Sequence, residues 1–560
     1  MATLSARTEQ VSRAAARRAM PDECALPPRR RRAHIPVMRF PLLATFCVAL
    51  LGLPSATSAQ AAPKKPSLIV LVTIDQFRGD YLERFGPQLT GGIARLVRGG
   101  AVFTNAHHDH AITETAPGHA TLLAGRFPRS TGIMMNAIGV TDSSAPLVAG
   151  GYGTGASPTR FNGTTLVDWL RGANARSRVL SVSMKDRAAI LPIGRSRSEV
   201  YWYSPDGRFV TSKYYGDSLP TWVSQFNDAG MAQSYGGKQW TLLLPESAYP
   251  EPDSVPAESD GTGFTFPHAL PADGFDAASM VRTTPFMDDL VVAFALAGVS
   301  KLKLGTGPGT DLLALSLSAT DVIGHRFGPD SREIHDQVLR VDRAVGTLLD
   351  SLFKLRDSTT ITIAFTADHG VGTLPELAPA SVQPRPQRVS LAKALSAIRA
   401  GMPAAHLDST MIGIDGNLVF IDRNAFKAAK VNADSTLDAL AVALRGTPGV
   451  ARVDRFTKLL ADTAGDPVAR RWAHQFPPNV PIELIVTLTP FSVFPGNVAA
   501  HASGYDYDSH VPLIFYGDGV KPGRFTEFVR TVDLAPTLAA IAGVKPAERL
   551  DGVVLTKAVR

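Results

Sequence analysis

The 560-residue chain is predicted to adopt an α/β fold, with a central, largely parallel sheet flanked by helices. Four apolar segments rich in Val, Ile and Leu indicate this, because strands buried on both faces of a parallel sheet read as near-continuous hydrophobic runs. They are SLIVLVTID ending at Asp75, RVLSVSMKDR ending at Arg187, DLLALSLSATD ending at Asp321 and TTITIAFTADHG ending at Gly370. Helical periodicity lies between them, for instance over residues 330–353, and the final SHVPLIFYGDGV returns to the sheet.

Two segments interrupt this alternation and are predicted to be cap insertions. Residues 195–285 are rich in Tyr, Trp, Ser, Pro and Gly, so a loop-rich insertion is expected there. Residues 376–490 contain strand-like NLVFIDR, helix-like STLDALAVALRGTPG and strand-like VARVDRF, which predicts a small α+β cap. The catalytic domain is predicted to span 62–560, since a chain this long needs one large domain with insertions or two domains.

The first 61 residues are predicted to be an N-terminal extension and a signal peptide. RRRR precedes Met38 and the apolar run FPLLATFCVALLGLP, which is shorter than the roughly 20 residues that a membrane span needs. SAQA then supplies small residues for cleavage near Ala61 and Ala62. We expect a true start at Met38 and a periplasmic or secreted protein with no membrane anchor in its mature form.

Composition and charge limit the kinds of partner that the protein is expected to bind. The chain is 45% hydrophobic and 19% charged, a globular balance without a signature of disorder. Its net charge of +7 comes almost entirely from residues 1–61, which hold nine Arg and three acids, so only +1 remains for the rest and no nucleic-acid partner is expected. Cys24 and Cys47 also lie there, so neither a disulfide nor thiol chemistry is expected in the mature protein.

Acids and histidines gather at the ends of the predicted strands, where open α/β sheets place their sites. They are Asp75, Asp321, His325, Asp368, His369 and His510. Each alone is more simply a cap, a turn former or a hydrogen-bonded core residue. Together they are oxygen and imidazole ligands without a thiolate, which suits zinc, and six such groups can hold two ions.

Thr115 stands before Ala-Pro-Gly-His in AITETAPGHATLLAG, at the start of a helix predicted over 116–124. As an N-cap, with Pro117 in the first turn and Gly125 as terminator, it needs no further role. A helix N-terminus also favours an anion, and a nearby metal ion can lower the pKa of a hydroxyl so that it attacks as an alkoxide. A cap and a nucleophile both remain open on these grounds.

These motifs, in this order, resemble the alkaline phosphatase superfamily of two-metal phosphohydrolases. The resemblance is closest to bacterial phosphate-irrepressible alkaline phosphatases that use a threonine nucleophile, which are related to nucleotide pyrophosphatase/phosphodiesterases. It runs from residue 66 to the end of the chain. The motifs that carry it are VTIDQFRGDYLERF, TETAPGHATLLAG, MMN, SMKDRAAILP, ATDVIGHRFGP, FTADHGV and YDYDSHVPLIFYG.

The resemblance implies two Zn²⁺ ions and a phosphothreonine intermediate formed and hydrolysed by two in-line displacements. One ion would be held by Asp321, His325 and His510. The other would be held by Asp75, Asp368 and His369, with Thr115 as its reactive ligand. Asn136 would donate a hydrogen bond to a phosphoryl oxygen. His119 and His501 are interpreted as structural or supporting residues, and HHDH at 107–110 as ordinary strand-end polarity.

The type of ester is decided by SMKDR, because monoesterases and diesterases of this superfamily share the other motifs. A phosphate monoester is close to a dianion, and Lys185 and Arg187, two positions apart, can share a face and offer it a point charge and a fork. A solvated basic turn is the alternative. We therefore predict a monomeric, broad-specificity phosphate monoester hydrolase that scavenges phosphate from small-molecule esters. A phosphodiesterase or nucleotide pyrophosphatase on the same fold is the second hypothesis, a non-enzymatic binding protein the third.

Overall fold

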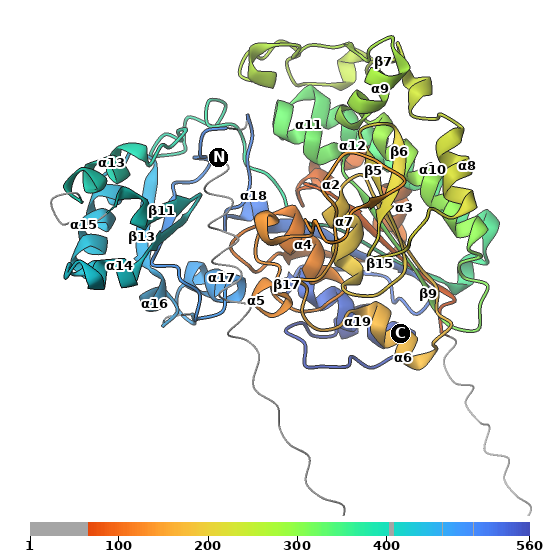
Figure 1. The fold of residues 1–560 in the computed structure, drawn as a ribbon. Helices are drawn as coiled ribbons and strands as arrows, with labels where there is room; N and C mark the ends of the chain where they lie inside the picture. Colours follow the sequence, from red (N-terminus) through yellow and green to blue (C-terminus); the bar gives the residue numbers. More distant parts are fainter. Residues whose placement is uncertain (1–64, 403–407, 462, 497) are drawn as a thin grey trace, which may run out of the picture. The chain divides into compact units, whose positions relative to one another are not determined.

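The computed structural model describes residues 65–560, apart from 403–407, 462 and 497. The described residues fall in one compact unit, Lys65–Arg560. The predicted extension and signal peptide at 1–61 lie outside the described residues. Helices and strands alternate along most of the chain, as the labels of Figure 1 show.

The central sheet has 11 strands, and its middle is parallel as predicted. The parallel strands, in spatial order, are β10 (Ile361–Ala367), β1 (Leu68–Ile74), β9 (Asp311–Leu317), β4 (Val179–Ser183) and β5 (Glu199–Ser204). Beyond β10 the sheet continues with β15 (His510–Gly517) and β2 (Ala101–His107), each antiparallel to its preceding neighbour. The remaining strands are β16 (Gly523–Phe525), β17 (Val529–Arg530), β6 (Arg208–Ser212) and β3 (Leu147–Val148). The prediction of a largely parallel α/β sheet is confirmed.

Helices cover both faces of the sheet, which explains why its central strands are apolar without alternation. One set of side chains from β1, Leu68 to Ile74 at every second position, packs in the same core as three helices. These are α3 (Gly92–Gly99), α10 (Phe286–Lys301) and α12 (Arg332–Leu355). Ile69 and Leu71 enter the opposite core with α4 (Thr115–Leu122), α6 (Leu166–Ala173) and α19 (Leu534–Ala542).

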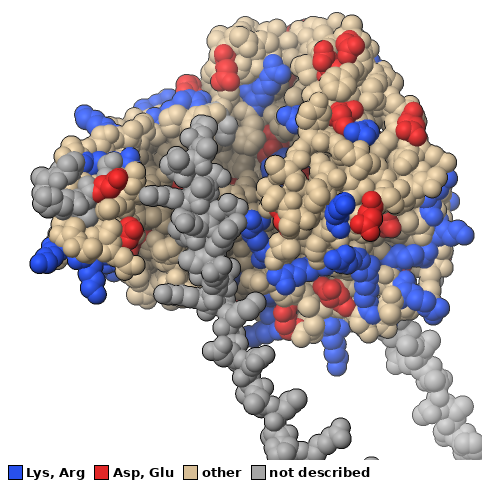
Figure 2. All heavy atoms as spheres, viewed as in Figure 1, with Lys and Arg blue, Asp and Glu red and all other residues tan. Residues whose placement is uncertain are grey.

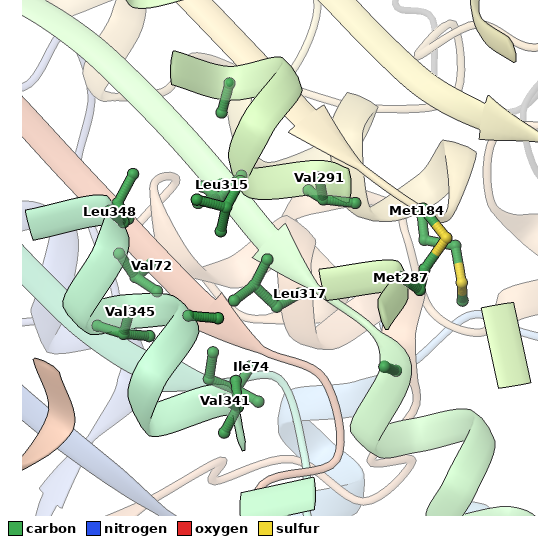
Figure 3. Packing of buried hydrophobic residues seen from close by; sticks show 14 of the residues in the cluster. Val72, Ile74, Met184, Met287, Val291, Leu315, Leu317, Val341, Val345 and Leu348 are labelled. Atoms are coloured by element: carbon green, nitrogen blue, oxygen red, sulfur yellow. The ribbon is translucent and has the colours of Figure 1, made fainter. Parts of the chain in front are cut away.

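Figure 3 shows the first of these cores near the C-terminal ends of β1 and β9. Val72 and Ile74 of β1 lie beside Leu315 and Leu317 of β9 in this cluster. The helices contribute Met287 and Val291 from α10 and Val341, Val345 and Leu348 from α12. All of these side chains are at least 97% buried, so the strand ends above them have a rigid support.

The first insertion is less loop-rich than predicted. Its opening residues form β5 and β6, which extend the central sheet because their aromatic side chains are buried. The rest holds α8 (Thr221–Asp228), α9 (Gly274–Met280) and a small antiparallel pair of strands, β7 (Gln239–Trp240) and β8 (His268–Ala269). Asp336 of α12 ties this part down by accepting bonds from Trp240 Nε1 (2.7 Å) and Tyr249 Oη (2.7 Å).

The second insertion has its own antiparallel sheet, in the order β11 (Ile412–Asp415), β12 (Leu418–Ile421), β14 (Leu484–Leu488) and β13 (Val450–Arg455). The helices α13 (Ala392–Gly401), α14 (Arg423–Ala428) and α15 (Ala433–Arg445) accompany it, and side chains from all of them share a separate core. The strand-like and helix-like segments read from the sequence fall on β12, α15 and β13. A further helix, α17 (Pro467–Gln475), connects this insertion to the main unit.

Figure 2 shows Lys and Arg side chains interspersed with Asp and Glu on one face of the described part. Within residues 65–560, as far as they are described, no single helix has the length and hydropathy of a membrane span. The segments Gly274–Thr283 and Phe286–Lys301 reach those values only as a pair bent by 97°.

We predict that Leu315→Ala lowers the free energy of unfolding by about 2–5 kcal/mol, because it leaves a cavity between β9 and the covering helices. Leu315 is 1% exposed. Val442→Ala on α15 is the control: Val442 is 65% exposed, and its loss is expected to change stability by less than about 0.5 kcal/mol. Chemical denaturation of both variants measures the difference, and equal stability of the two would contradict the described core.

Candidate active site

Four neighbouring parallel strands deliver polar side chains to one edge of the sheet. Asp368 and His369 follow β10, Asp75 follows β1, Asp321 lies in the first turn of α11 (Ala319–Phe327) after β9, and Lys185 follows β4. The strand ends are in register, since Ile74 pairs with both Ala367 and Leu317. The sheet order β10-β1-β9-β4 thus converts four distant sequence positions into one cluster.

Lys185 lies at the centre of this cluster. Its ammonium Nζ is 2.7 Å from Asp75 Oδ2 and 2.6 Å from Asp321 Oδ2. The same nitrogen is 3.4 Å from the Thr115 hydroxyl oxygen. Burial by itself lowers the pKa of Lys185, but the carboxylates of Asp321 and Asp75 outweigh it, so the pKa is raised and the side chain stays cationic.

Three histidines present their Nε2 atoms to the cluster, because their Nδ1 atoms are engaged elsewhere. The Nδ1 atoms of His369, His325 and His501 lie 2.9, 2.8 and 2.7 Å from the backbone carbonyl oxygens of Gly370, Ala499 and Thr113 respectively. Because a carbonyl only accepts, each Nδ1 carries the proton in a neutral ring and each Nε2 is left with its lone pair. This is the arrangement found in metal-ligating histidines.

Two groups of potential ligand atoms result. In the first, His369 Nε2 is 3.6 Å from Asp75 Oδ1, 3.9 Å from Asp321 Oδ1 and 3.7 Å from Asp368 Oδ2. In the second, His325 Nε2 is 3.4 Å from Asp321 Oδ1 and 3.1 Å from His501 Nε2. Asp321 belongs to both groups, so two ions bound here would share the same cluster.

The residues fit a pair of divalent cations. Both carboxylate oxygens of Asp75, Oδ2 of Asp368 and Nε2 of His369 are fully buried without a hydrogen-bond partner, although Lys185 and His119 approach the carboxylates as ion pairs. Burial and the neighbouring Asp368 raise the pKa of Asp75. Buried acids so close together need compensating positive charge, and one ammonium balances only one of three. The oxygen and imidazole donors suit metal ions such as zinc.

The structure does not bring His510 together with Asp321 and His325 as predicted. His510 opens β15, where its Nε2 lies 2.9 Å from the Thr104 carbonyl oxygen and its ring stacks on His107 at 4.9 Å. His501, which we interpreted as a supporting residue, takes that position in the second group. The two histidines stand nine positions apart, His501 before β15 and His510 at its first residue, and the path of the intervening loop separates their positions.

Thr115 is the first residue of α4, and the N-cap position belongs to Glu114. The Thr115 hydroxyl makes no capping bond and instead faces Lys185, so the interpretation as a mere cap is not supported. Asn136 lies beside the start of α4. Its side-chain Oδ1 accepts from the Ala116 N–H at 2.8 Å, and its backbone N–H donates to Glu114 Oε2 at 2.6 Å. Glu114 is therefore a bracing residue that the sequence motifs did not reveal.

Lys185 and Arg187 do not lie on one face of a strand, as expected from their spacing, because both come after the end of β4. β4 ends at Ser183, and Lys185 is the N-cap of α7 (Asp186–Ile190), so the turn into this helix aims the two side chains. The charge of Arg187 influences the pKa of both Lys185 and Glu114, which places it near them. Its buried Nε has no hydrogen-bond partner.

Two further residues hold the acids in place. Gln76, which sequence reasoning missed, donates from Nε2 to Asp321 Oδ1 at 3.0 Å and from its N–H to Asp368 Oδ1 at 3.1 Å. It adopts φ 65°, an uncommon value outside glycine. His119 is buried on α4 with Nδ1 3.0 Å from Asp368 Oδ2 and Nε2 2.9 Å from Ser316 Oγ, in agreement with a supporting role.

The HHDH segment lies outside both ligand groups. His108 contacts the carbonyl of Ala367 (2.9 Å) and the hydroxyl of Thr531 (3.0 Å) through its ring nitrogens. Asp109 pairs with Arg470 of α17 at 3.1 Å. The segment therefore contributes structural contacts at the end of β2, as its interpretation as strand-end polarity expects.

Comparison with known proteins agrees with this geometry. Residues 69–407 match the family described as type I phosphodiesterase / nucleotide pyrophosphatase. The chain belongs to this family. Alkaline phosphatase PhoV of Synechococcus elongatus is 32% identical over 518 residues, which cover 88% of this chain and 92% of that protein. Alkaline phosphatase PafA of Elizabethkingia meningoseptica is 29% identical over 518 residues, covering 88% and 94%.

The crystal structure of wild-type alkaline phosphatase PafA has the same fold, with a TM-score of 0.80 and 27% identity. The alignment covers 89% of this chain and 100% of that one. Both of these relatives, each matched over most of the chain, are thus described as alkaline phosphatases. The predicted resemblance to that superfamily, and to an alkaline phosphatase in particular, is confirmed.

We predict that Gly118→Ala lowers kcat/KM by about a hundredfold, because a displacement of the Thr115 hydroxyl by about 1 Å is enough to reduce the rate to that extent. A β-carbon on Gly118 would lie 2.3 Å from the Asp368 carbonyl oxygen, so α4 and Thr115 must shift. Gly172→Ala is the matched control, since α6 leaves open space there. Steady-state kinetics with circular dichroism separate lost catalysis from lost folding; full activity in Gly118→Ala would show that the contact does not position Thr115.

Proposed function

We propose that the protein hydrolyses small-molecule phosphate monoesters as an alkaline phosphatase, through a covalent phosphothreonine at Thr115. The observation that carries the proposal is the Lys185 ammonium, which lies between two buried carboxylates and 3.4 Å from the Thr115 hydroxyl. A nucleophile, a cation and a metal-ligating set thereby converge within one cluster. The alkaline phosphatase relatives over most of the chain support the same activity.

The ligands of the two proposed Zn²⁺ ions come from the two groups described above, with Asp321, which belongs to both, assigned to the second. Asp75, Asp368 and His369 would hold one ion beside Thr115, and Asp321, His325 and His501 would hold the other. When bound, the ions supply positive charge that lowers the pKa of the threonine hydroxyl and stabilises the departing oxygen. The backbone carbonyls bonded to each Nδ1 orient the histidines for this task.

The residues of the chain itself carry the remaining steps. The Thr115 hydroxyl gives its proton to water and its Oγ attacks phosphorus. The new O–P bond forms as the ester O–P bond breaks, and the electron pair leaves with the alcohol oxygen, which takes a proton from water. Lys185 and Arg187 then balance the charge on the phosphoryl oxygens, and the Asn136 amide, held by Ala116 N–H, is available to donate to one of them. Water displaces Thr115 in a second step and releases inorganic phosphate.

A phosphodiesterase or nucleotide pyrophosphatase is the second candidate, and the family match favours it. Lys185, 3.4 Å from the Thr115 hydroxyl, and Arg187, whose charge acts on Lys185, distinguish the candidates. A diester offers one charged oxygen fewer and a bulky second group, and Lys185 with Arg187 exceeds what it needs. We therefore place the monoester first.

The cellular setting follows from the predicted signal peptide. We propose export to the periplasm or the medium, a monomeric mature enzyme and a role in scavenging phosphate from esters that cannot cross the membrane. Fractionation of cells that express the full chain, with activity measured in each fraction, tests the export; activity confined to the cytoplasm would refute it.

We predict that His501→Ala lowers the bound zinc from two ions per chain to one, because the second ion loses one of three protein ligands. His510→Ala is the control and keeps both ions, since His510 is bonded to the Thr104 carbonyl. Metal analysis after dialysis measures both variants. Loss of zinc from the His510 variant alone would return the ligand role to His510.

We predict that Arg187→Ala lowers kcat/KM for nitrophenyl phosphate by about 10²–10³, the usual cost of losing one donor to developing negative charge. The effect on the matching methyl nitrophenyl diester is expected to be much smaller, and Thr115→Ala removes both activities. Arg176→Ala, at an exposed position, serves as control. A wild-type enzyme that prefers the diester and tolerates Arg187→Ala would establish the second candidate instead.

A further inference from the structure

A cavity of about 330 Å³ opens beside the second ligand group, and His501 is part of its wall. Glu114 and Met135, from the segments that hold Thr115 and Asn136, form another part. The remaining wall comes from the second insertion and the loop after it, including Leu418, Trp472 and Phe494. Its volume is at the lower end of small-molecule sites, which run from about 300 to 1,000 Å³.

The wall of the cavity is apolar and firmly supported. Leu418 and Trp472 are 2% and 5% exposed, and they pack in a common cluster with Phe476. On the other side, the ring of Phe491 stacks on Tyr507 at 4.6 Å, and the Tyr507 hydroxyl accepts from the Phe491 N–H at 3.0 Å. Such a wall is organised before a ligand arrives, so little ordering free energy opposes binding.

The charges of the lining do not suit an anion. Arg471 is the single basic side chain among the described lining residues apart from His501, and it already faces Asp506 at 3.4 Å and Asp109 at 3.8 Å. The acids Glu114 and Asp415 also line the cavity. A second phosphate or a carboxylate placed here would lack a free cation, whereas an uncharged ring would bury apolar surface.

The position of the cavity matches the departing half of the substrate. Attacking and leaving oxygens lie roughly in line across phosphorus. The attacking hydroxyl of Thr115 lies beside Lys185, while His501 lies beside His325 in the other ligand group. A group that departs on the side of His325 and His501 enters the cavity directly.

We propose that this cavity is the leaving-group subsite, and that it selects monoesters of uncharged, aromatic-ring-sized alcohols over small alkyl or anionic ones. The inference rests on the proposed function and adds the substrate class. Remote binding energy of this kind raises kcat/KM without touching the reacting atoms. Trp472 and Val468, both on α17, are thereby specificity-determining residues.

The test compares benzyl phosphate with ethyl phosphate, because both release simple alcohols and differ mainly in the ring, and adds 3-phosphoglycerate as the anionic ester. For the wild type we expect kcat/KM for benzyl phosphate to exceed that for ethyl phosphate by about tenfold or more, a modest value for an apolar pocket. We expect 3-phosphoglycerate to be the poorest of the three.

Two variants approach the cavity from opposite directions. Trp472→Ala removes wall, and Val468→Phe fills the space from a half-buried position on α17. Both are expected to bring the benzyl-to-ethyl ratio close to one. For Val468→Phe, kcat/KM for ethyl phosphate is expected to change by less than about threefold, since the reacting groups are untouched. Val442→Phe, at an exposed position on α15, controls for an added ring and leaves the ratio unchanged.

The outcomes distinguish a failure of the subsite proposal from a failure of the proposed function. Ethyl phosphate hydrolysis with a ratio near one in the wild type, or a ratio that survives Val468→Phe, would overturn the subsite and leave the proposed function standing. A wild-type enzyme that hydrolyses none of the monoesters would overturn the proposed function and the subsite with it.

Discussion

Three carboxylates buried side by side are the constraint that the elements around the site must satisfy. Asp75, Asp321 and Asp368 each follow a central strand, and the parallel register brings their oxygens to one edge. Burial and the neighbouring Asp368 raise the pKa of Asp75, whereas Lys185 and His325 hold the pKa of Asp321, and His369 and His119 hold the pKa of Asp368, below the usual range despite burial. The surrounding elements supply compensating charge and hydrogen bonds: the Lys185 ammonium pairs with Asp75 and Asp321, Gln76 donates to Asp321 and His119 lies 3.0 Å from Asp368 Oδ2. The acids and neighbouring histidines also form two candidate metal sites.

The same constraint explains why the supporting core is so uniform. A site that concentrates like charge needs strand ends that do not move, and these ends rest on fully buried aliphatic side chains of β1 and β9 (Figure 3). Gly118 lets α4 approach the Asp368 backbone closely enough for Thr115 to join the cluster. The position of Thr115 thus depends on close packing, because a glycine stands where the helix that carries Thr115 meets the end of β10.

The second insertion is fastened to the loop that carries Thr115 and Asn136. Gln475 of α17 accepts from the Ile112 N–H at 2.8 Å and donates to the Met134 carbonyl, and thus braces that loop on both sides. His474 stacks on Phe127 at 3.8 Å, next to α5 (Pro128–Thr131), and Figure 1 shows α17 beside this helix. The insertion that lines the cavity therefore also braces the loop of Thr115, through Gln475 and His474.

The sequence by itself determined the sheet, its strands and most of the site, because apolar runs and the polar residues that end them are local signals. Asp75, Asp368 and His369 lie directly after strands, and Asp321 with His325 share one helix face, so their meeting follows from a parallel sheet. Tertiary structure alone decided between His501 and His510, since the loop before β15 sends one ring to the cluster and the other to the Thr104 carbonyl. It also supplied Gln76, Glu114 and the cavity, whose partners are distant in sequence or brought near by backbone turns that no local pattern records.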